Sequence, residues 1–132
     1  SKFTSDDRLF DYQKIIIEKL AASESCVIVG KCADYILKDY DNVVSIYVEA
    51  PRSYTLRRVM ERMDDITVEE AHHLITKTDK YRADYYKYYT GQEWKNAQNY
   101  DLSLDSSRLG FDGTVEAILS YIEVRKKFDK TM

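Results

Sequence analysis

Residues 52–63 read R-S-Y-T-L-R-R-V-M-E-R-M, and residues 67–91 read T-V-E-E-A-H-H-L-I-T-K-T-D-K-Y-R-A-D-Y-Y-K-Y-Y-T-G. Apolar residues recur at helical spacing in both stretches. Pro51 precedes the first helix, a capping box of Thr67 and Glu70 starts the second, and Gly91 ends it. Cations gather on both predicted helices: Arg52, Arg57, Arg58, Arg62, Lys77, Lys80, Arg82 and Lys87. Because the whole chain has a net charge of −3, this concentration is local. It suits an anion clamp, although a solvated helix face gives the same pattern.

Short apolar stretches flank the two helices and predict the strands of a sheet. Residues 26–30 (C-V-I-V-G) and 43–50 (V-V-S-I-Y-V-E-A) are too short for helices, and apolar and polar residues alternate in 100–106. Further helices are predicted from Ser5 and Asp6 to Ser23, over 33–38, and after Asp112. The core residues of this last helix are predicted to be Val115, Ile118, Leu119 and Ile122. Alternating helices and strands predict one α/β domain, residues 1–132, with a mostly parallel sheet.

Composition restricts the class of protein. The 132 residues are 44% hydrophobic and 33% charged, as in an ordinary globular domain. Acidic residues outnumber basic ones by 23 to 20, which disfavours general nucleic-acid binding. No apolar run has the length of a membrane span, so we expect no membrane partner. Cys26 and Cys32 are too few for a disulfide framework and predict free thiols in a reducing cytoplasm.

The known phosphate-binding motifs are absent from these 132 residues. The pattern G-x-x-x-x-G-K-[ST] fails around Gly30 and Lys31, because Ser25 stands at the first glycine and Cys32 at the final hydroxyl position. There is no G-x-G-x-x-G either. Lys31 still follows a predicted strand, where ligands bind in open α/β sheets. It is therefore either a phosphate ligand or a solvated charge.

Other polar patterns allow two interpretations each. Asp105 and Ser106 are either a candidate polar site at a strand end or a cap of the turn that follows the strand. Five tyrosines between Tyr81 and Tyr89 could stack on bases, but they more often pack a lid or an interface. His72 and His73 are adjacent in a helix and do not face each other, so no metal site is predicted.

Four segments together resemble the bacterial cytidylate kinase-like family. They are C-V-I-V-G-K-C-A-D-Y-I-L (26–37), A-P-R-S-Y-T-L-R-R-V-M-E-R (50–62), T-D-K-Y-R-A-D-Y-Y-K-Y-Y-T-G-Q-E-W (78–94) and N-Y-D-L-S-L-D-S-S-R-L-G (99–110). The resemblance follows the same order over nearly the whole chain. It implies an ATP-dependent nucleoside-monophosphate kinase with a three-layer, P-loop-kinase-like α/β fold, a parallel sheet and a helical lid at about residues 62–91.

The resemblance also implies roles for individual residues. Those that would neutralise the transferring phosphoryl group are Arg58, Arg62, Lys80 and Arg82. Those near the acceptor are Lys31, Asp34, Lys77 and Asp79, and those near the donor base are Asp105, Ser106 and Ser107. The parent protein would use ATP and Mg²⁺ and a small nucleotide acceptor. Lys31 replaces an arginine of the family, and the lid is less arginine-rich than in cytidylate kinases. The resemblance therefore does not imply specificity for CMP.

The resemblance does not include the N-terminal elements of the family. The family's first strand and phosphate loop would precede the residues near Phe3, and that strand would lie between the predicted strands at Val27 and Val44. We therefore expect an incomplete sheet whose edges are covered by rearrangement, by further residues or by another chain, as in a homo-oligomer. The 132-residue chain is predicted to need no cofactor of its own and to be inactive as a kinase. The alternative is a non-catalytic module that binds a nucleotide, RNA or protein through its cationic, tyrosine-rich lid.

Overall fold

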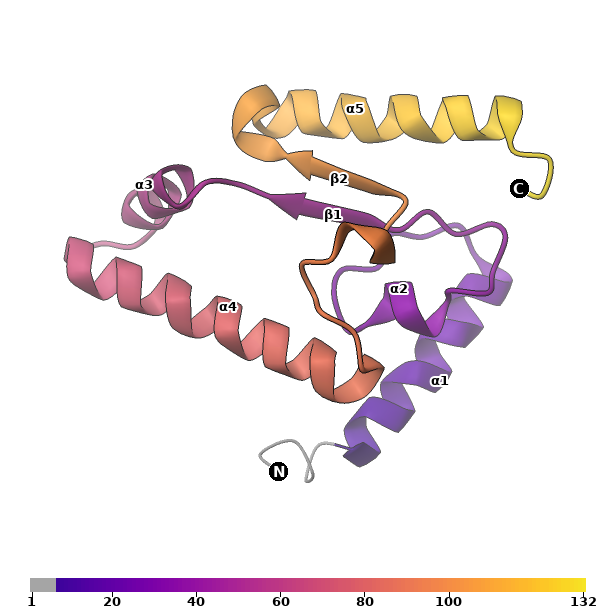
Figure 1. Cartoon of the computed structure of the whole chain (residues 1–132), viewed down its shortest axis with the longest axis horizontal. Helices are drawn as coiled ribbons and strands as arrows, with labels where there is room; N and C mark the ends of the chain where they lie inside the picture. Colours follow the sequence, from indigo (N-terminus) through magenta and orange to yellow (C-terminus); the bar gives the residue numbers. More distant parts are fainter. Residues whose placement is uncertain (1–6) are drawn as a thin grey trace.

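The computed structural model describes residues 7–132 and shows an α/β architecture (Figure 1). Its elements, in chain order, are α1 (Asp7–Ser23), α2 (Ala33–Ile36), β1 (Ile46–Glu49), α3 (Arg52–Arg62), α4 (Val68–Thr90), the 3-10 helix η2 (Ala97–Asn99), β2 (Leu102–Asp105) and α5 (Ser106–Phe128). The α/β class is therefore confirmed. The predicted start of the first helix at Ser5 and Asp6 lies outside the described residues.

The two strands are parallel, as predicted, and form a two-stranded sheet. Ile46 is in register with Leu102, and Glu49 with Asp105. Just before the ladder, the backbone amide of Ser45 donates to the Asp101 carboxylate over 2.9 Å, which fixes this register. Both strands end toward α3, and α5 runs back alongside them (Figure 1). The carboxyl ends of both strands therefore face the helix pair α3–α4.

The strand predicted at residues 26–30 is wrong. Residues 24–29 belong to no strand, and the Val27 and Val29 side chains are 92% and 84% exposed. Ile28, between them, packs against the core formed by Ile17, Ala33 and Leu37. Within residues 7–132 the segment has no neighbouring strand to pair with.

The start of the last helix also differs from the prediction. Asp105, and not Asp112, is its N-cap, and its carboxylate accepts from the Ser107 amide over 2.9 Å. The helix is broken at Gly110, where a positive φ of 71° is compatible with glycine. Gly110 thus marks a break inside α5 and not a turn before it.

The buried face of α5 is also only partly as predicted. Ile118 and Ile122 are partly buried, but Val115 and Leu119 are 41% and 56% exposed. Part of the apolar surface expected in the core therefore faces outward. None of the described helices is long and apolar enough to cross a lipid bilayer.

The capping box of α4 offers a test of local stability. The Glu70 amide donates to the Thr67 hydroxyl and the Thr67 amide to the Glu70 carboxylate, each over 3.1 Å. Since Thr67 is exposed, Thr67→Ala removes the cap and little packing, and should lower the free energy of unfolding by about 1 kcal/mol. Urea denaturation followed by circular dichroism measures this. Thr67→Ser, the matched control, should retain most of the stability, and equal loss in both variants would contradict a capping role.

Candidate functional site

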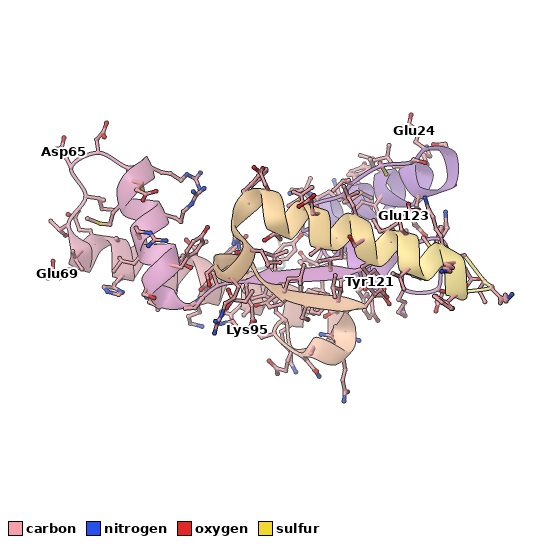
Figure 2. All side chains as sticks on the ribbon, turned by 90° about the horizontal axis from the view of Figure 1, so that it is seen from above. Glu24, Asp65, Glu69, Lys95, Tyr121 and Glu123 are labelled. Carbon is pink, nitrogen blue, oxygen red and sulfur yellow. The ribbon has the colours of Figure 1, made fainter. Side chains whose placement is uncertain are left out.

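A cleft of about 540 Å³ lies at the carboxyl ends of the two strands. This is the edge at which open parallel sheets bind ligands. The lining residues come from both strands, from α3 and α4, and from the segment that leaves α4: Tyr47, Val48, Glu49, Ala50, Pro51, Tyr54, Thr55, Arg58, Asp79, Arg82, Trp94, Lys95, Asp105 and Ser106. Figure 2 shows Lys95 where the strand ends face the α3–α4 pair. Segments that are distant in sequence therefore meet at one site.

Contacts between α3 and α4 set the position of the cleft's arginines. Arg52, in the first turn of α3, donates to the His72 carbonyl over 3.3 Å and to the Thr76 hydroxyl over 3.1 Å, both on α4. These bonds tie the two helices together one turn or more before Arg58 and Arg82. The guanidinium groups of Arg58 and Arg82 consequently reach the same cleft from two helices.

Three cations in the cleft have no ion-pair partner. Some cations elsewhere on the surface are paired: Lys80 with Asp84 at 2.8 Å and Lys87 with Glu93 at 2.9 Å, for example. Within residues 7–132, no carboxylate lies within ion-pair distance of Arg58, Arg82 or Lys95. Guanidinium and ammonium groups that converge without partners are suited to bind an anion.

The carboxylates of the cleft differ in the groups with which they interact. Asp105 caps α5, and hydrogen bonds from the Ser107 side chain and backbone lower its pKa. Glu49 and Asp79 both lie close enough to Tyr47 to act on it electrostatically. Burial, followed by these two negative charges, raises the pKa of the Tyr47 hydroxyl. The lining of the cleft therefore contains three carboxylates, Glu49, Asp79 and Asp105, as well as its three cations.

The cleft brings together some of the predicted site residues and not others. Those that line it are Arg58, Arg82, Asp79, Asp105 and Ser106. Those that do not are Arg62, Lys80, Lys77, Lys31, Asp34 and Ser107. Of this second group, Lys80 is paired with Asp84 and Ser107 donates to the cap residue Asp105. The first group is thus the best starting point for a binding site.

Asp34 lies in a separate polar cluster at the far end of α4. The buried hydroxyl of Tyr86 donates to its carboxylate over 2.7 Å, and the Gln92 side-chain amide lies 3.0 Å from the same hydroxyl. Burial raises the pKa of Asp34, and the Tyr86 hydrogen bond partly offsets this effect. In this structure Asp34 therefore joins α2 to the end of α4.

Lys31 is exposed and lies in a turn with unusual backbone geometry. Gly30, Lys31 and Cys32 have φ values of 68°, 61° and 58°, so three successive residues are left-handed. For residues with a Cβ atom this conformation costs about 1–2 kcal/mol each. The Cys32 thiol is buried, and burial raises its pKa to about 12, so it is not a thiolate nucleophile at neutral pH.

Sequence reasoning missed several residues of the cleft, above all Lys95, Trp94 and Tyr54. Lys95 and Trp94 lie between α4 and η2, where no helical or strand period indicates which side chains share a face. Tyr54 was counted only as part of the basic helix. The only signal in the sequence for Trp94 was that it lies in the segment 78–94, which resembles the cytidylate kinase-like family.

Comparisons with known proteins extend the picture. Residues 1–108 match the model of the cytidylate kinase-like family. The chain is 31% identical over 121 residues to a cytidylate kinase of Archaeoglobus fulgidus, covering 91% of this chain but only 64% of that relative. It also resembles a solved structure, an uncharacterized protein from Eubacterium ventriosum, with a TM-score of 0.79 and 29% identity. That similarity covers 92% of this chain and 76% of the other.

Proposed function

Because this chain belongs to the cytidylate kinase-like family, we propose that its cleft takes part in ATP-dependent phosphoryl transfer to a nucleoside monophosphate or similar small acceptor. The observation that carries this proposal is the convergence at the strand ends of Arg58, Arg82 and Lys95, which have no ion-pair partner among residues 7–132. Phosphoryl transfer depends mainly on positioning and on stabilising the charge of the phosphate oxygens. Two guanidinium forks on a helix pair are suited to that task.

The other predicted site residues have secondary roles in the proposed binding of the nucleotides. Arg62, Lys77 and Lys80 project from the same two helices outside the cleft, so they reach a ligand only if α3 and α4 move toward the strands as a lid. Lys31, held on its left-handed turn, is proposed to contact the acceptor phosphate. Asp79, Asp105 and Ser106 line the cleft and provide its polar contacts.

The exposed apolar surface supports a sheet that is completed by residues outside these 132. β1 pairs with β2 on one side only within residues 7–132, and Val48 is 48% exposed. Val27 and Val29 leave a second extended apolar segment uncovered. We propose a P-loop-kinase-like fold in which another strand, followed by its phosphate loop, lies between β1 and the segment around Val27 and Val29. Without that loop the 132-residue chain should bind anions but not catalyse transfer.

The expected cofactors fit the residues to different degrees. The phosphate chain of ATP fits the three unpaired cations of the cleft. For Mg²⁺, the described part of the chain contains no group of three or more His, Cys, Asp or Glu side chains that could hold an ion. Mg²⁺ commonly binds through phosphate oxygens and water with few protein ligands, so in this proposal it arrives with the nucleotide.

Calorimetric titration of the chain with ATP and with CMP tests the anion site. Removing one charge-assisted hydrogen bond should weaken nucleotide binding about tenfold or more in Arg58→Ala and in Arg82→Ala. Lys126→Ala, which removes a cation from the exposed far end of α5, is the control and should bind like the wild type. Nucleotide affinity that is unchanged in both arginine variants would contradict the site.

A coupled kinase assay tests the role of the missing loop separately. The pure 132-residue chain should give no ATP-dependent phosphorylation of nucleoside monophosphates, because no backbone cradle for the donor phosphates is present in its sequence. Turnover above a no-protein control, lost in Arg58→Ala, would contradict this expectation while supporting the cleft itself.

A further inference from the structure

Lys95 is the one cation of the cleft that does not come from a helix. It lies in the segment between α4 and η2, beside Trp94 (Figure 2). Its side chain lines the same cleft as Arg58 and Arg82, and no carboxylate of the described residues neutralises it. Like charges that line one cleft repel each other, and a bound anion relieves that repulsion.

The backbone on the helix side of Lys95 is held by several contacts. The Tyr100 hydroxyl donates to the Trp94 carbonyl over 2.6 Å, and the Asn99 amide group donates to the Glu93 carbonyl over 2.7 Å. The Trp94 ring also packs edge-on against the buried Tyr47 ring, with 5.6 Å between the centroids. Lys95 therefore extends from an anchored segment next to β1, so the backbone that carries it needs little ordering when a ligand binds.

The three cations come from three different elements, α3, α4 and the segment after α4. The arginine forks can each bind two oxygens, whereas the lysine provides a compact positive charge. Spread around a cleft of about 540 Å³, they suit a ligand with several linked anionic groups better than a single phosphate. A chain of two or more phosphates has this chemistry.

We infer that Lys95 binds the phosphate chain of a nucleoside di- or triphosphate in the cleft, as the third cation beside Arg58 and Arg82. This inference rests on the proposed function and gives Lys95 a specific role within it, the binding of linked phosphates. It assigns the segment after α4, and not only the two helices, to the binding site. Trp94 acts as a positioning residue, because it anchors the lysine through Tyr47 and Tyr100.

Titration with inorganic tripolyphosphate, which has no base or sugar, tests Lys95 directly. Lys95→Ala should weaken binding about tenfold, the loss expected for one charge-assisted contact. Lys95→Arg should recover most of the affinity, because the positive charge is kept. Lys126→Ala is the matched control for a lost surface charge. Orthophosphate should bind much more weakly, and Lys95→Ala should change its affinity less.

The outcomes separate this inference from the proposed function. If the wild type binds tripolyphosphate and Arg58→Ala weakens it while Lys95→Ala does not, the role of Lys95 is wrong and the anion site stands. If the wild type binds no tripolyphosphate at millimolar concentration, both are wrong. Because Lys95 is exposed, its variants should unfold at the wild-type temperature. A loss of affinity without a change in unfolding temperature, rescued by arginine, supports direct contact.

Discussion

Replacing Arg125 with alanine is expected to lower the free energy of unfolding by about 2 to 3 kcal/mol. The Arg125 side chain is only 14% exposed and donates to the Val43 carbonyl over 2.6 Å and to the Asp41 carbonyl over 3.0 Å. It also pairs with Asp129 at 2.9 Å and with Asp101 at 3.3 Å. One guanidinium group thus joins the end of α5 to the chain that enters β1 and to Asp101, which fixes the strand register. Its loss removes the donor from the Val43 and Asp41 carbonyls and one cation from each of the two carboxylates.

Urea denaturation monitored by circular dichroism measures this loss against two controls. Lys126→Ala removes the neighbouring cation, which is paired with Glu123 at 3.5 Å on an exposed surface, and should change stability by about 0.5 kcal/mol or less. Arg125→Lys keeps the charge but cannot reach both carbonyls and both carboxylates, so it should lie between alanine and the wild type. An Arg125→Ala protein as stable as Lys126→Ala would disprove the importance of this contact.

The pH dependence of stability gives a second readout of the same contact. Hydrogen bonds from Thr131, followed by Arg125, lower the pKa of Asp129 to about 2. Since the folded-state pKa is below the ordinary value of about 4, the carboxylate stabilises the fold above that value. This contribution is lost as the pH falls from about 4 toward 2. In Arg125→Ala the loss over this interval should be smaller, because one of the groups that lowers the pKa is gone.

The second large effect is expected at Tyr86. Tyr86→Phe should lower the free energy of unfolding by about 1 to 3 kcal/mol at neutral pH, because the partly buried Asp34 carboxylate loses its 2.7 Å hydrogen bond. Asp34→Asn should instead leave stability unchanged or higher. An amide oxygen can still accept from Tyr86, and the cost of burying a charge disappears. Equal losses in the two variants would mean that the charge of Asp34 itself stabilises the fold.

The sign of the pH effect follows from the direction of the Asp34 shift. Burial raises the pKa of Asp34 in the folded state, so the folded protein holds this proton more tightly than the unfolded chain does. The contribution of Asp34 to stability therefore falls as the pH rises from about 4 through the folded-state pKa. Tyr86→Phe should enlarge this fall, because the hydrogen bond that lowers the pKa is removed. Asp34→Asn should abolish it. Unfolding curves at a series of pH values distinguish the three proteins.

The elements that were predicted well are those specified by neighbouring residues. The capping box at Thr67 and Glu70 and the alternation in residues 100–106 are local signals, and α4 and β2 appear where they predict. The strand predicted at Val27 was wrong because a strand also needs a partner, which sequence periodicity does not reveal. For the same reason the start of α5 was misplaced: whether Asp105 ends a strand or caps a helix depends on its surroundings.

The candidate site was predictable in part for a similar reason. Arg58 and Arg82 lie on regular helices, so their role could be inferred from charge pattern and resemblance, and both line the cleft. Lys95 could not be inferred, because its position depends on contacts with Tyr100 and Tyr47 through the adjoining Trp94. The substrate-binding role of Asp34 stays a prediction. Its hydrogen bond with Tyr86 could not be inferred from the sequence, because the two residues are 52 positions apart.

The pairing of β1 with β2 has a consequence for how the chain folds. Ser45 and Asp101, which begin the ladder, are 56 residues apart in sequence, and α3 and α4 lie between them. Closing such a loop costs entropy before any strand contact forms, whereas the contacts within the helix pair are nearer in sequence. The helix pair is therefore expected to be structured in the transition state, and the strands to join late. Weakening α4 should slow folding, and weakening the Asp101 contacts should mainly accelerate unfolding.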